Sequence, residues 1–223
     1  MQAADARNLI YVQLARVAQA LAAPGRLRLL DLLCQGEKSV DVLARQAGQS
    51  LALASAHLKV LREAKLVEAR RDGRHVLYRI AGEAVERFWL SLRELGQGLI
   101  PEVREMLTRF FDSPEDLKPV DWGDLIRQVQ EGAVTLIDVR TAQEFAQGHL
   151  PGAVSIPFDQ LGARLASLPR SGAFAAYCRG PLCVTAVNAV ALMRSAGLNV
   201  KRICGGVSEW KEAGHPLEVS SKE

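Results

Sequence analysis

Apolar residues in the first half of the chain recur every three or four positions, which is the spacing of amphipathic helices. Pro24-Gly25 is expected to end the first helix and Gly36 the second, while Ser39 and Ser50 are suitable N-caps for a third and a fourth. The expected helices cover residues 3–22, 26–35, 40–47 and 51–65. Because few residues join the last two helices, they form a helix-turn-helix candidate.

A β-hairpin is expected directly after these helices. Residues 66–71 and 74–80 are strand-like runs joined by Asp72-Gly73, a dipeptide that tolerates the positive φ of a tight turn. This hairpin would be the wing of a winged helix-turn-helix domain. Further helices are expected over residues 82–95 and 101–111, with Gly96-Gln97-Gly98 interrupting the helical run between them.

From residue 121 onward, short apolar strands alternate with helical segments, a pattern typical of a parallel α/β sheet. The strands are expected at residues 134–139, 173–178 and 200–204. The sequence therefore predicts two domains, a mainly α winged helix-turn-helix domain over residues 1–111 and an α/β domain over residues 120–223. A polar, proline-containing linker over residues 112–119 would join them.

The charge of the chain is concentrated in one place, although the net charge of all 223 residues is +3. Residues 57–79 carry a net charge of +4, which is expected of a surface that faces phosphates, but a solvated helix face and hairpin would have the same composition. No apolar run approaches the ~20 residues that span a bilayer, and the N-terminus lacks the pattern of a signal peptide. We therefore expect a cytoplasmic protein without a membrane partner.

Three segments of the first half resemble the ArsR family of winged-helix repressors. They are Ala23–Leu30, Ser55–Val67 and the wing Arg71–Arg79, and the resemblance covers roughly residues 5–100. It implies that the helix over residues 50–65 enters the major groove of double-stranded DNA and that the wing follows the backbone or the minor groove. It also implies a homodimer made by the first and last helices of the domain, and a symmetric dimer predicts a palindromic operator.

The candidate DNA-binding residues lie in this helix and in the wing. The basic residues among them are expected to contact phosphates, which gives affinity and salt dependence without specificity. The start of the helix is apolar where the family is usually polar, and apolar side chains read thymine methyl groups but form no hydrogen bonds with guanine. His57 matches the family pattern but equally fits an inward or interhelical position. The set is Ser50, Leu51, Ala52, Ser55, His57, Lys59, Arg62, Arg71 and Arg74.

No metal site is expected, although many ArsR proteins are metal sensors. The stretch Glu37–Val42 lacks the cysteine pair usual at the third helix, and the helix over residues 82–95 contains no histidine. Metal-responsive regulation stays an alternative that stoichiometric metal in the purified protein would reveal. Cys34 is expected to be a buried small apolar residue, with a redox role as the alternative.

Six segments of the second half resemble the rhodanese family of sulfurtransferases, over about residues 117–218. In that family a cysteine at the end of a central strand carries a persulfide between a sulfur donor and an acceptor. Cys178 occupies this position, and a loop of backbone N–H groups before a helix is expected to lower its thiol pKa. The segments are Leu136–Arg140, Glu144-Phe145, Gly148–Ala153, Ile156-Pro157, Tyr177–Cys183 and Gly205–Trp210.

The loop that follows Cys178 separates this chemistry from phosphoryl transfer. Related phosphatases and arsenate reductases place an oxyanion-binding arginine six residues after the cysteine, but this chain has Val184 there. Arg179 is expected to attract an anionic donor, whereas Gly180 replaces the lysine typical of thiosulfate enzymes. The candidate active-site loop after Cys178 is Arg179, Gly180, Pro181, Leu182 and Cys183.

Other polar and cysteine residues of this half are expected around the loop. Cys183 either attacks a persulfide on Cys178, giving a disulfide and sulfide, or packs at the helix start. Asp138 and Arg140 are supporting residues near the site. Glu144 and His149 are expected to hold loops by hydrogen bonds, and Cys204 is expected in the core.

Together these features predict a dimeric, DNA-binding repressor whose rhodanese domain senses or transfers sulfane sulfur, from a donor such as thiosulfate or polysulfide, through a Cys178 persulfide. No cofactor is expected. An active sulfurtransferase whose DNA-binding domain is autoregulatory is the alternative. Coupling between the two domains is inferred here from their fusion alone.

Overall fold

The computed structural model describes residues 3–110 and 120–219, which fall into two compact units, one up to Trp89 and one from Leu90 onward. The predicted linker, residues 112–119, lies outside the described residues. Among the helices that are described, none combines the length and the apolar character needed to cross a membrane.

Four helices open the first unit, as the sequence predicts. They are α1 (Ala3–Leu21), α2 (Pro24–Leu33), α3 (Val40–Ala47) and α4 (Leu51–Glu63). One boundary differs, because Pro24 and Gly25 are the first residues of α2 and not a break before it. Proline suits the first turn of a helix, where its fixed φ is already helical and no N–H partner is needed.

The predicted N-caps of α3 and α4 are confirmed. The Ser39 hydroxyl accepts a hydrogen bond from the backbone N–H of Val42, and the Ser50 hydroxyl accepts one from that of Leu53 at 3.2 Å. Each cap satisfies one of the backbone donors that the first turn of a helix leaves without a partner. The buried face of α4 is formed by side chains one helical turn apart, namely Ala54, Leu58 and Leu61.

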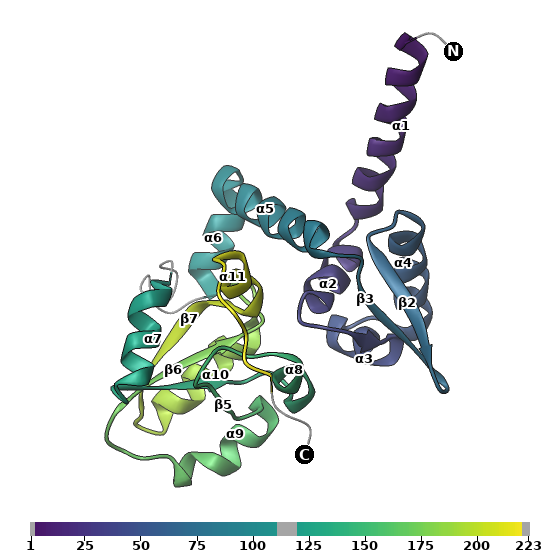
Figure 1. Ribbon diagram of the computed structural model, residues 1–223. Helices are drawn as coiled ribbons and strands as arrows, with labels where there is room; N and C mark the ends of the chain where they lie inside the picture. Colours follow the sequence, from purple (N-terminus) through teal and green to yellow (C-terminus); the bar gives the residue numbers. More distant parts are fainter. Residues whose placement is uncertain (1–2, 111–119, 220–223) are drawn as a thin grey trace. The chain divides into compact units, whose positions relative to one another are not determined.

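The wing is present as a hairpin of β2 (Val67–Asp72) and β3 (His75–Ile80), which Figure 1 shows beside α4. Asp72 pairs with His75, so the two turn residues are Gly73 and Arg74 and not the predicted Asp72-Gly73. Gly73 alone of these has a positive φ, as at the first position of a type II′ turn. A strand that the sequence did not predict, β1 (Lys38–Ser39), pairs antiparallel with β3.

Helices α5 (Glu83–Leu99) and α6 (Pro101–Phe110) follow the wing. The prediction that Gly96 and Gly98 interrupt the helical run is wrong, since α5 continues through both. A glycine within a helix costs about 1 kcal/mol relative to alanine, which weakens the helix without ending it. The break comes at Ile100, before Pro101 begins α6.

The second unit contains the predicted parallel sheet. Its strands are β4 (Val134–Asp138), β5 (Val154–Ser155), β6 (Ala173–Cys178) and β7 (Asn199–Gly206), in the order β5-β4-β6-β7. All three pairings are parallel. The helices of this unit are α7 (Trp122–Gln130), α8 (Ala142–Gln147), α9 (Phe158–Arg164), α10 (Val184–Ser195) and α11 (Val207–Glu212), with a 3-10 turn at Leu165–Ser167.

Two apolar cores cover the two faces of this sheet, as the helices on either side of it in Figure 1 indicate. Phe174 and Ala176 of β6 pack with α9 and α10, whereas Ala175 and Tyr177 pack with α7 and α11. The side chains of β6 are buried on both faces, as expected of a central parallel strand. The strand therefore delivers its last residue, Cys178, to a fixed position at the carboxyl edge of the sheet.

Candidate functional site

One face of α4 and the adjoining wing carry nearly all of the predicted DNA-binding residues at the surface. We call this set the α4–wing surface. Leu51, Ser55, Lys59 and Arg62 are spaced three or four residues apart on α4 and form one exposed stripe opposite the buried face. Its exposed members are Ser50, Leu51, Ala52, Ser55, Lys59, Arg62, Arg71 and Arg74.

Two kinds of arginine occur on and around the wing. Arg70 pairs with Glu37 and Arg79 pairs with Glu68, with Nε to carboxylate oxygen distances of 2.8 and 2.9 Å. Arg62, Arg71 and Arg74 are exposed instead, and none of them forms an ion pair with any described residue. The predicted phosphate-contacting arginines thus keep their charge available for an external anion.

The N-terminal end of α4, which the sequence predicts to read bases, is apolar and exposed. Leu51 and Leu53 are 50% and 47% exposed, although leucine is among the residues most often found in a core. His57 is placed differently, because a Cβ on Gly25 would lie 2.7 Å from its Nε2 atom. His57 therefore packs closely against the start of α2, the interhelical position that the sequence left open.

The predicted active-site loop joins β6 to α10, and we call residues Cys178–Cys183 the cysteine loop. The backbone N–H of Cys183 donates to the carbonyl of Gly180 at 3.1 Å, and Gly180 has a φ of +134° that other residues rarely adopt. The backbone of Gly206 lies against the loop, since a Cβ there would be 2.6 Å from the carbonyl oxygen of Cys178. These contacts hold the loop against β7.

The two thiols of the loop share a hydrogen bond. Burial raises the pKa of Cys178 well above 9.0, because the side chain is 1% exposed, and the hydrogen bond to Cys183 raises it further. The hydrogen bond from Cys178 outweighs burial at Cys183 and lowers its pKa to about 5, helped by the Arg179 backbone N–H and the Thr185 hydroxyl. The expected lowering of the Cys178 pKa is therefore wrong for the reduced loop, where the lowered pKa is that of Cys183.

The side chain of Arg179 is directed to a carboxylate. Its Nε and Nη2 atoms each donate to the carboxylate of Glu144 at 2.7 Å, and Glu144 also accepts hydrogen bonds from Thr141 in a capping box of α8. The pair orients the loop, while the arginine charge still lowers the pKa of both thiols. An anionic donor would compete with Glu144 for this guanidinium, which weakens the expected role of Arg179 in attracting it.

The supporting residues Asp138 and Arg140 form a fully buried ion pair at the end of β4. Arg140 Nη2 lies 2.6 Å from Asp138 Oδ2 and 2.8 Å from the carbonyl oxygen of Gly148. The guanidinium carbon lies 5.7 Å from the centre of the Tyr177 ring, and the Tyr177 hydroxyl accepts a hydrogen bond from the backbone N–H of Leu150. This network holds residues 148–150 against β6, at Tyr177, the residue before Cys178.

His149 also holds a loop, as predicted. Its Nδ1 atom lies 2.9 Å from the carbonyl oxygen of Phe145, and the two rings stack. Its backbone N–H and carbonyl pair with Glu218 near the end of the described chain. His149 therefore joins α8 to the C-terminal segment and is not part of the cysteine loop.

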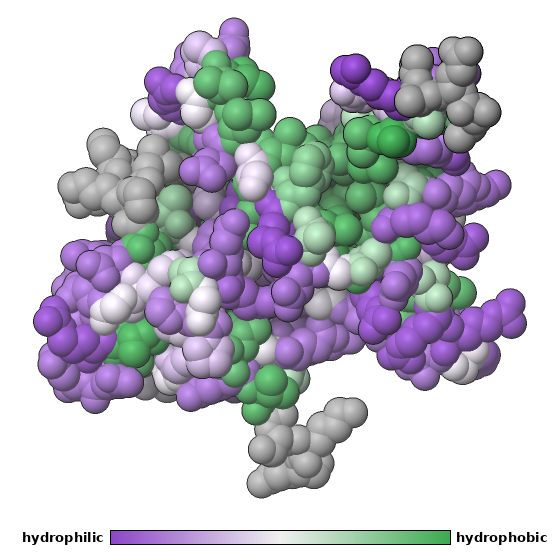
Figure 2. Space-filling view, turned by 45° about the horizontal axis from the view of Figure 1, so that its top comes forward, coloured by the Kyte–Doolittle hydropathy of each residue, from purple (hydrophilic) through white to green (hydrophobic). Residues whose placement is uncertain are grey.

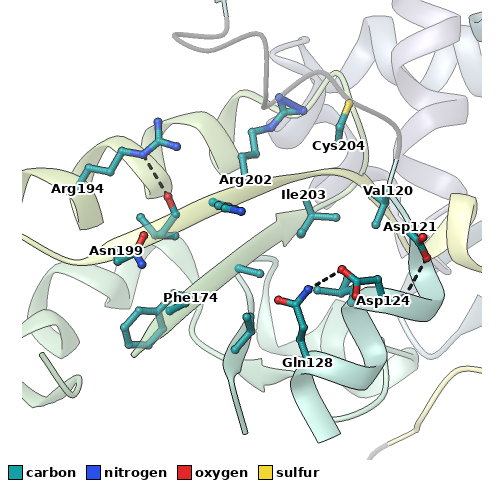
Figure 3. A pocket seen from close by; sticks show the side chains of 16 residues that line it. Val120, Asp121, Asp124, Gln128, Phe174, Arg194, Asn199, Arg202, Ile203 and Cys204 are labelled. Carbon is teal, nitrogen blue, oxygen red and sulfur yellow. Dashed lines mark hydrogen bonds between the residues drawn. The ribbon is translucent and has the colours of Figure 1, made fainter. Parts of the chain in front are cut away.

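A hollow of about 860 Å³ lies beside β7 (Figure 3). Arg202 and Cys204 of β7 and Asp124 and Gln128 of α7 line it, and no residue of the cysteine loop does so. Arg202 connects the two regions, because its Nη2 atom donates to the carbonyl oxygen of Pro181 at 2.9 Å. Cys204 is partly buried there, so its predicted place in the core is wrong.

The fourth cysteine, Cys34, lies outside the cysteine loop. Cys34 is buried in the first unit, as the sequence predicts. Within residues 3–110 and 120–219, no three histidine, cysteine or acidic side chains come together in a way that could hold a metal ion.

Three residues that matter for the cysteine loop were not singled out in the sequence. Gly206 belongs to a recognised segment, but its close approach to the loop backbone depends on the β6–β7 pairing. Arg202 and Thr185 carry no motif. Only the fold brings Arg202 to Pro181, whereas Thr185 lies two residues after Cys183 in the first turn of α10. For Gly206 the sequence offered one signal, a pair of glycines directly after the predicted strand 200–204.

Comparison with known proteins finds two families in the order that the structure shows. The arsR family of bacterial regulatory proteins matches residues 23–69, and the rhodanese-like domain matches residues 121–213. An HTH-type transcriptional regulator of Mycobacterium tuberculosis is 42% identical over 214 residues, which is 96% of this chain and 94% of that protein.

Two further relatives each match one part. A sulfurtransferase of Allochromatium vinosum is 31% identical over 85 residues, 38% of this chain and 78% of that protein. A solved homodimeric winged helix-turn-helix DNA-binding domain from Mycobacterium bovis is 42% identical and covers 45% of this chain and 92% of its own, with a TM-score of 0.42.

Proposed function

We propose a sulfur-responsive repressor, because this chain belongs to the ArsR family of bacterial regulatory proteins and carries a C-terminal rhodanese-like domain. In this proposal a homodimer in the cytoplasm binds a palindromic operator through the α4–wing surface. The rhodanese-like domain takes sulfane sulfur from a small donor as a persulfide on Cys178. The persulfide state and the thiol state of the protein then differ in operator affinity, which is what coupling requires.

The charge and shape of the α4–wing surface support DNA binding. An exposed α-helix fits the major groove of B-DNA, and exposed cations beside it can contact the phosphates on either side. Lys59, Arg62, Arg71 and Arg74 supply such cations along one helix and one hairpin. Leu51 and Ala52 at the start of α4 favour contacts with thymine methyl groups, so we expect an operator rich in A·T pairs at these positions.

The apolar surface of α1 supports a homodimer. Apart from its last two residues, α1 buries little, and Figure 2 shows hydrophobic side chains exposed beside the grey atoms of the N-terminal end. Most of the stability of a helix in a protein comes from packing, and a cluster of exposed apolar side chains marks an interaction surface. A second copy of the chain would cover it. The large apolar residues concerned are Leu9, Ile10, Tyr11, Val12 and Leu14.

The observation that carries the sulfur chemistry is the position of Cys178. It ends a central strand, is followed by a loop that leads into the N-terminus of α10, and has the backbone N–H of Arg179 directed at its sulfur. Such N–H groups stabilise the negative charge of a thiolate or persulfide. Because Arg179 is engaged by Glu144, an uncharged or singly charged donor such as hydrogen polysulfide suits this loop better than doubly charged thiosulfate.

The loading step transfers one sulfur atom. The proton of Cys178 passes along its hydrogen bond to the Cys183 thiolate, and the Cys178 thiolate attacks the terminal sulfur of the polysulfide. A bond forms between Cys178 Sγ and that sulfur, the S–S bond of the donor breaks, and the shortened polysulfide leaves with the electron pair. The product is a persulfide on Cys178.

The test is operator binding by the full-length protein in its different sulfur states. Fluorescence anisotropy with the DNA upstream of its own gene is measured for the wild type and Cys178→Ser, each with and without hydrogen polysulfide, while intact mass follows the modification. We expect polysulfide to change the affinity of the wild type about tenfold or more and to leave Cys178→Ser unchanged. Full modification of Cys178 with unchanged affinity would overturn the sensor.

An active sulfurtransferase is the second candidate, and the cysteine at the end of β6 together with the similarity to a sulfurtransferase over 85 residues favours it. It predicts multiple turnovers of sulfur transfer from polysulfide to a thiol acceptor, at a rate independent of bound operator. A sensor instead predicts about one sulfur transferred per chain before the reaction stops. Counting turnovers on the same samples separates the two.

A further inference from the structure

The cysteine loop holds two thiols whose environments differ. Cys178 is almost completely buried at the end of β6, whereas Cys183 is partly exposed and is the N-cap of the 12-residue helix α10. The two side chains are hydrogen bonded to each other across the loop, and neither forms a disulfide. A sulfane sulfur on Cys178 would therefore stand next to a second sulfur nucleophile.

We propose that Cys183 resolves the persulfide on Cys178, so that each loading event ends in an internal Cys178–Cys183 disulfide and one released sulfide. This inference rests on the proposed persulfide chemistry of Cys178 and adds a second reacting residue to it. It makes the loop a dithiol–disulfide switch that sulfane sulfur oxidises.

The surroundings of Cys183 favour its thiolate form. The N-terminal end of α10 carries partial positive charge, the backbone N–H of Arg179 and the hydroxyl of Thr185 both donate to the sulfur, and the charge of Arg179 lies close by. In the reduced loop the hydrogen bond from the Cys178 thiol is the main cause of the low pKa of Cys183, about 5. A persulfide on Cys178 removes that hydrogen bond, and the contacts with Arg179 and Thr185 remain to lower the pKa of Cys183. The attacking thiol needs to be ionised and accessible, and Cys183 meets both requirements better than Cys178 does.

The step balances without a further reagent. The proton that Cys183 accepted during loading first passes to the thiolate or polysulfide that leaves the donor. The Cys183 thiolate then attacks Sγ of Cys178, a bond forms between the two Sγ atoms, and the bond between Cys178 Sγ and the outer sulfur breaks. The outer sulfur leaves as hydrosulfide and carries the electron pair and the persulfide proton with it. The sulfane sulfur is reduced to sulfide, and the two cysteines are oxidised to the disulfide.

The disulfide would tighten the loop, because the two sulfur atoms must move from hydrogen-bonding contact to about 2.05 Å. Gly180 lies between the two cysteines and has a positive φ. Because glycine tolerates a wide range of φ, rotation of the backbone there can accommodate part of this movement. The carbonyl of Pro181, which accepts a hydrogen bond from Arg202, moves with the loop. The switch thus changes backbone contacts with β7 and the charge at the start of α10.

The experiment gives the full-length protein one equivalent of cysteine persulfide, because free cysteine then reports loading and sulfide reports resolution. Intact mass and peptide mapping are recorded for the wild type, Cys183→Ser, Cys178→Ser and the control Cys204→Ser. We expect the wild type and Cys204→Ser to lose two hydrogen atoms and to release cysteine and sulfide in equal amounts. We expect Cys183→Ser to gain one sulfur atom on Cys178 and to release cysteine without sulfide.

The outcomes separate this inference from the function on which it rests. If the wild type keeps an added sulfur on Cys178 just as Cys183→Ser does, resolution by Cys183 is wrong while the persulfide function stands. If Cys178 is never modified in either protein, the persulfide function itself fails and the inference fails with it. Cys183→Ala replaces Cys183→Ser if the serine variant loses the helical circular dichroism of the wild type.

Discussion

The α4–wing surface and the cysteine loop both depend on arginines, but they hold them in opposite ways. Arg71 and Arg74 lie exposed on the wing without an ion pair to any described residue. Arg140 and Arg179 are buried or nearly so, and each is fixed by a carboxylate, Asp138 or Glu144. The first arrangement suits a surface that gains its partner from outside, and the second suits a site that is already built in the free protein.

This difference predicts how substitutions will act in each region. Side chains of the α4–wing surface contribute nearly independently, so single changes should be small and add up. Side chains around the cysteine loop share hydrogen bonds, so one change leaves several buried groups without partners. The predictions that follow test this contrast, beginning with the buried network.

The largest effect is expected for Arg140→Met. Methionine removes the guanidinium and leaves the Asp138 carboxylate buried without its cation, since both side chains are fully buried. Breaking a buried pair in this way costs about 3–5 kcal/mol of unfolding free energy. Urea unfolding of the full chain, with hydrogen–deuterium exchange of β4 and β6 peptides, assigns the loss to the second unit.

Arg127→Met is the matched control in the same unit. Arg127 pairs with Asp124 on the exposed side of α7, and a surface pair of this kind contributes about 1 kcal/mol or less. Equal losses in the two variants would show that burial adds nothing to the contribution of the Asp138–Arg140 pair.

A second test concerns the backbone contact between Gly206 and the cysteine loop. In Gly206→Ala the new methyl group would lie 2.6 Å from the carbonyl oxygen of Cys178, and backbone atoms must move to make room. Overpacking of this kind costs about 1–3 kcal/mol, and we expect slower persulfide loading of Cys178 as well. Thermal unfolding and the rate of loading measure the two effects.

Gly162→Ala controls for the change of residue type. Nothing lies within 4 Å of a Cβ at Gly162 in α9, so alanine there should stabilise the helix by about 0.5–1 kcal/mol. A Gly206→Ala protein as stable and as reactive as the wild type would mean that β7 does not position the loop.

The elements that carry the two regions could be predicted from the sequence where the signal was local. Ser39 and Ser50 mark the starts of α3 and α4, and the apolar run 173–178 gives β6 to the residue. Local signals failed at two positions. Gly96 predicted a break but lies within α5, and Asp72 predicted a turn but is paired within the hairpin.

The sequence predicted that Glu144 holds a loop, but it did not predict which residues pair across the cysteine loop, because they are distant in sequence. Glu144 lies 35 residues before Arg179, and Arg202 lies 21 residues after Pro181. The raised pKa of Cys178 could not be predicted either, because it depends on how deeply the fold buries this side chain and on its contact with Cys183. The exposure of the wing arginines Arg71 and Arg74 was easier to predict, because the surroundings of an exposed side chain depend little on the rest of the fold.

The third test uses the pH dependence of thiol reactivity. With a pKa of about 5, Cys183 should be alkylated by iodoacetamide at a rate that is nearly constant above pH 6 and falls as the pH drops through 5, because the thiolate is then protonated. Cys178 should react more slowly at neutral pH, since burial raises its pKa. Peptide mass mapping after timed quenching follows both sites in one sample.

Cys178→Ala sharpens this test. It removes the hydrogen bond that is the main cause of the low pKa of Cys183, so the pH midpoint of Cys183 alkylation should rise by about one unit or more, and one unit corresponds to about 1.4 kcal/mol. An unchanged midpoint would assign the low pKa to the helix N-terminus and Arg179 alone.

The smallest effect is expected for single arginines of the wing. Arg71→Ala removes one exposed cation, so the slope of the logarithm of operator affinity against the logarithm of salt concentration should fall in magnitude by about one, with similar weakening on non-specific DNA. Fluorescence anisotropy titrations at several salt concentrations measure the slope, and the double variant with Arg74→Ala should lower it by about two.

Arg79→Ala is the matched control, because Arg79 lies on the same hairpin and is also exposed but is held by Glu68. An arginine that already has a carboxylate partner releases fewer counterions when DNA binds, so this variant should leave the slope nearly unchanged. A fall equal to that of Arg71→Ala would show that Glu68 gives way to phosphate. Exposed arginines would then be equivalent whatever their partners in the free protein, and the contrast with the buried pairs would depend on burial alone.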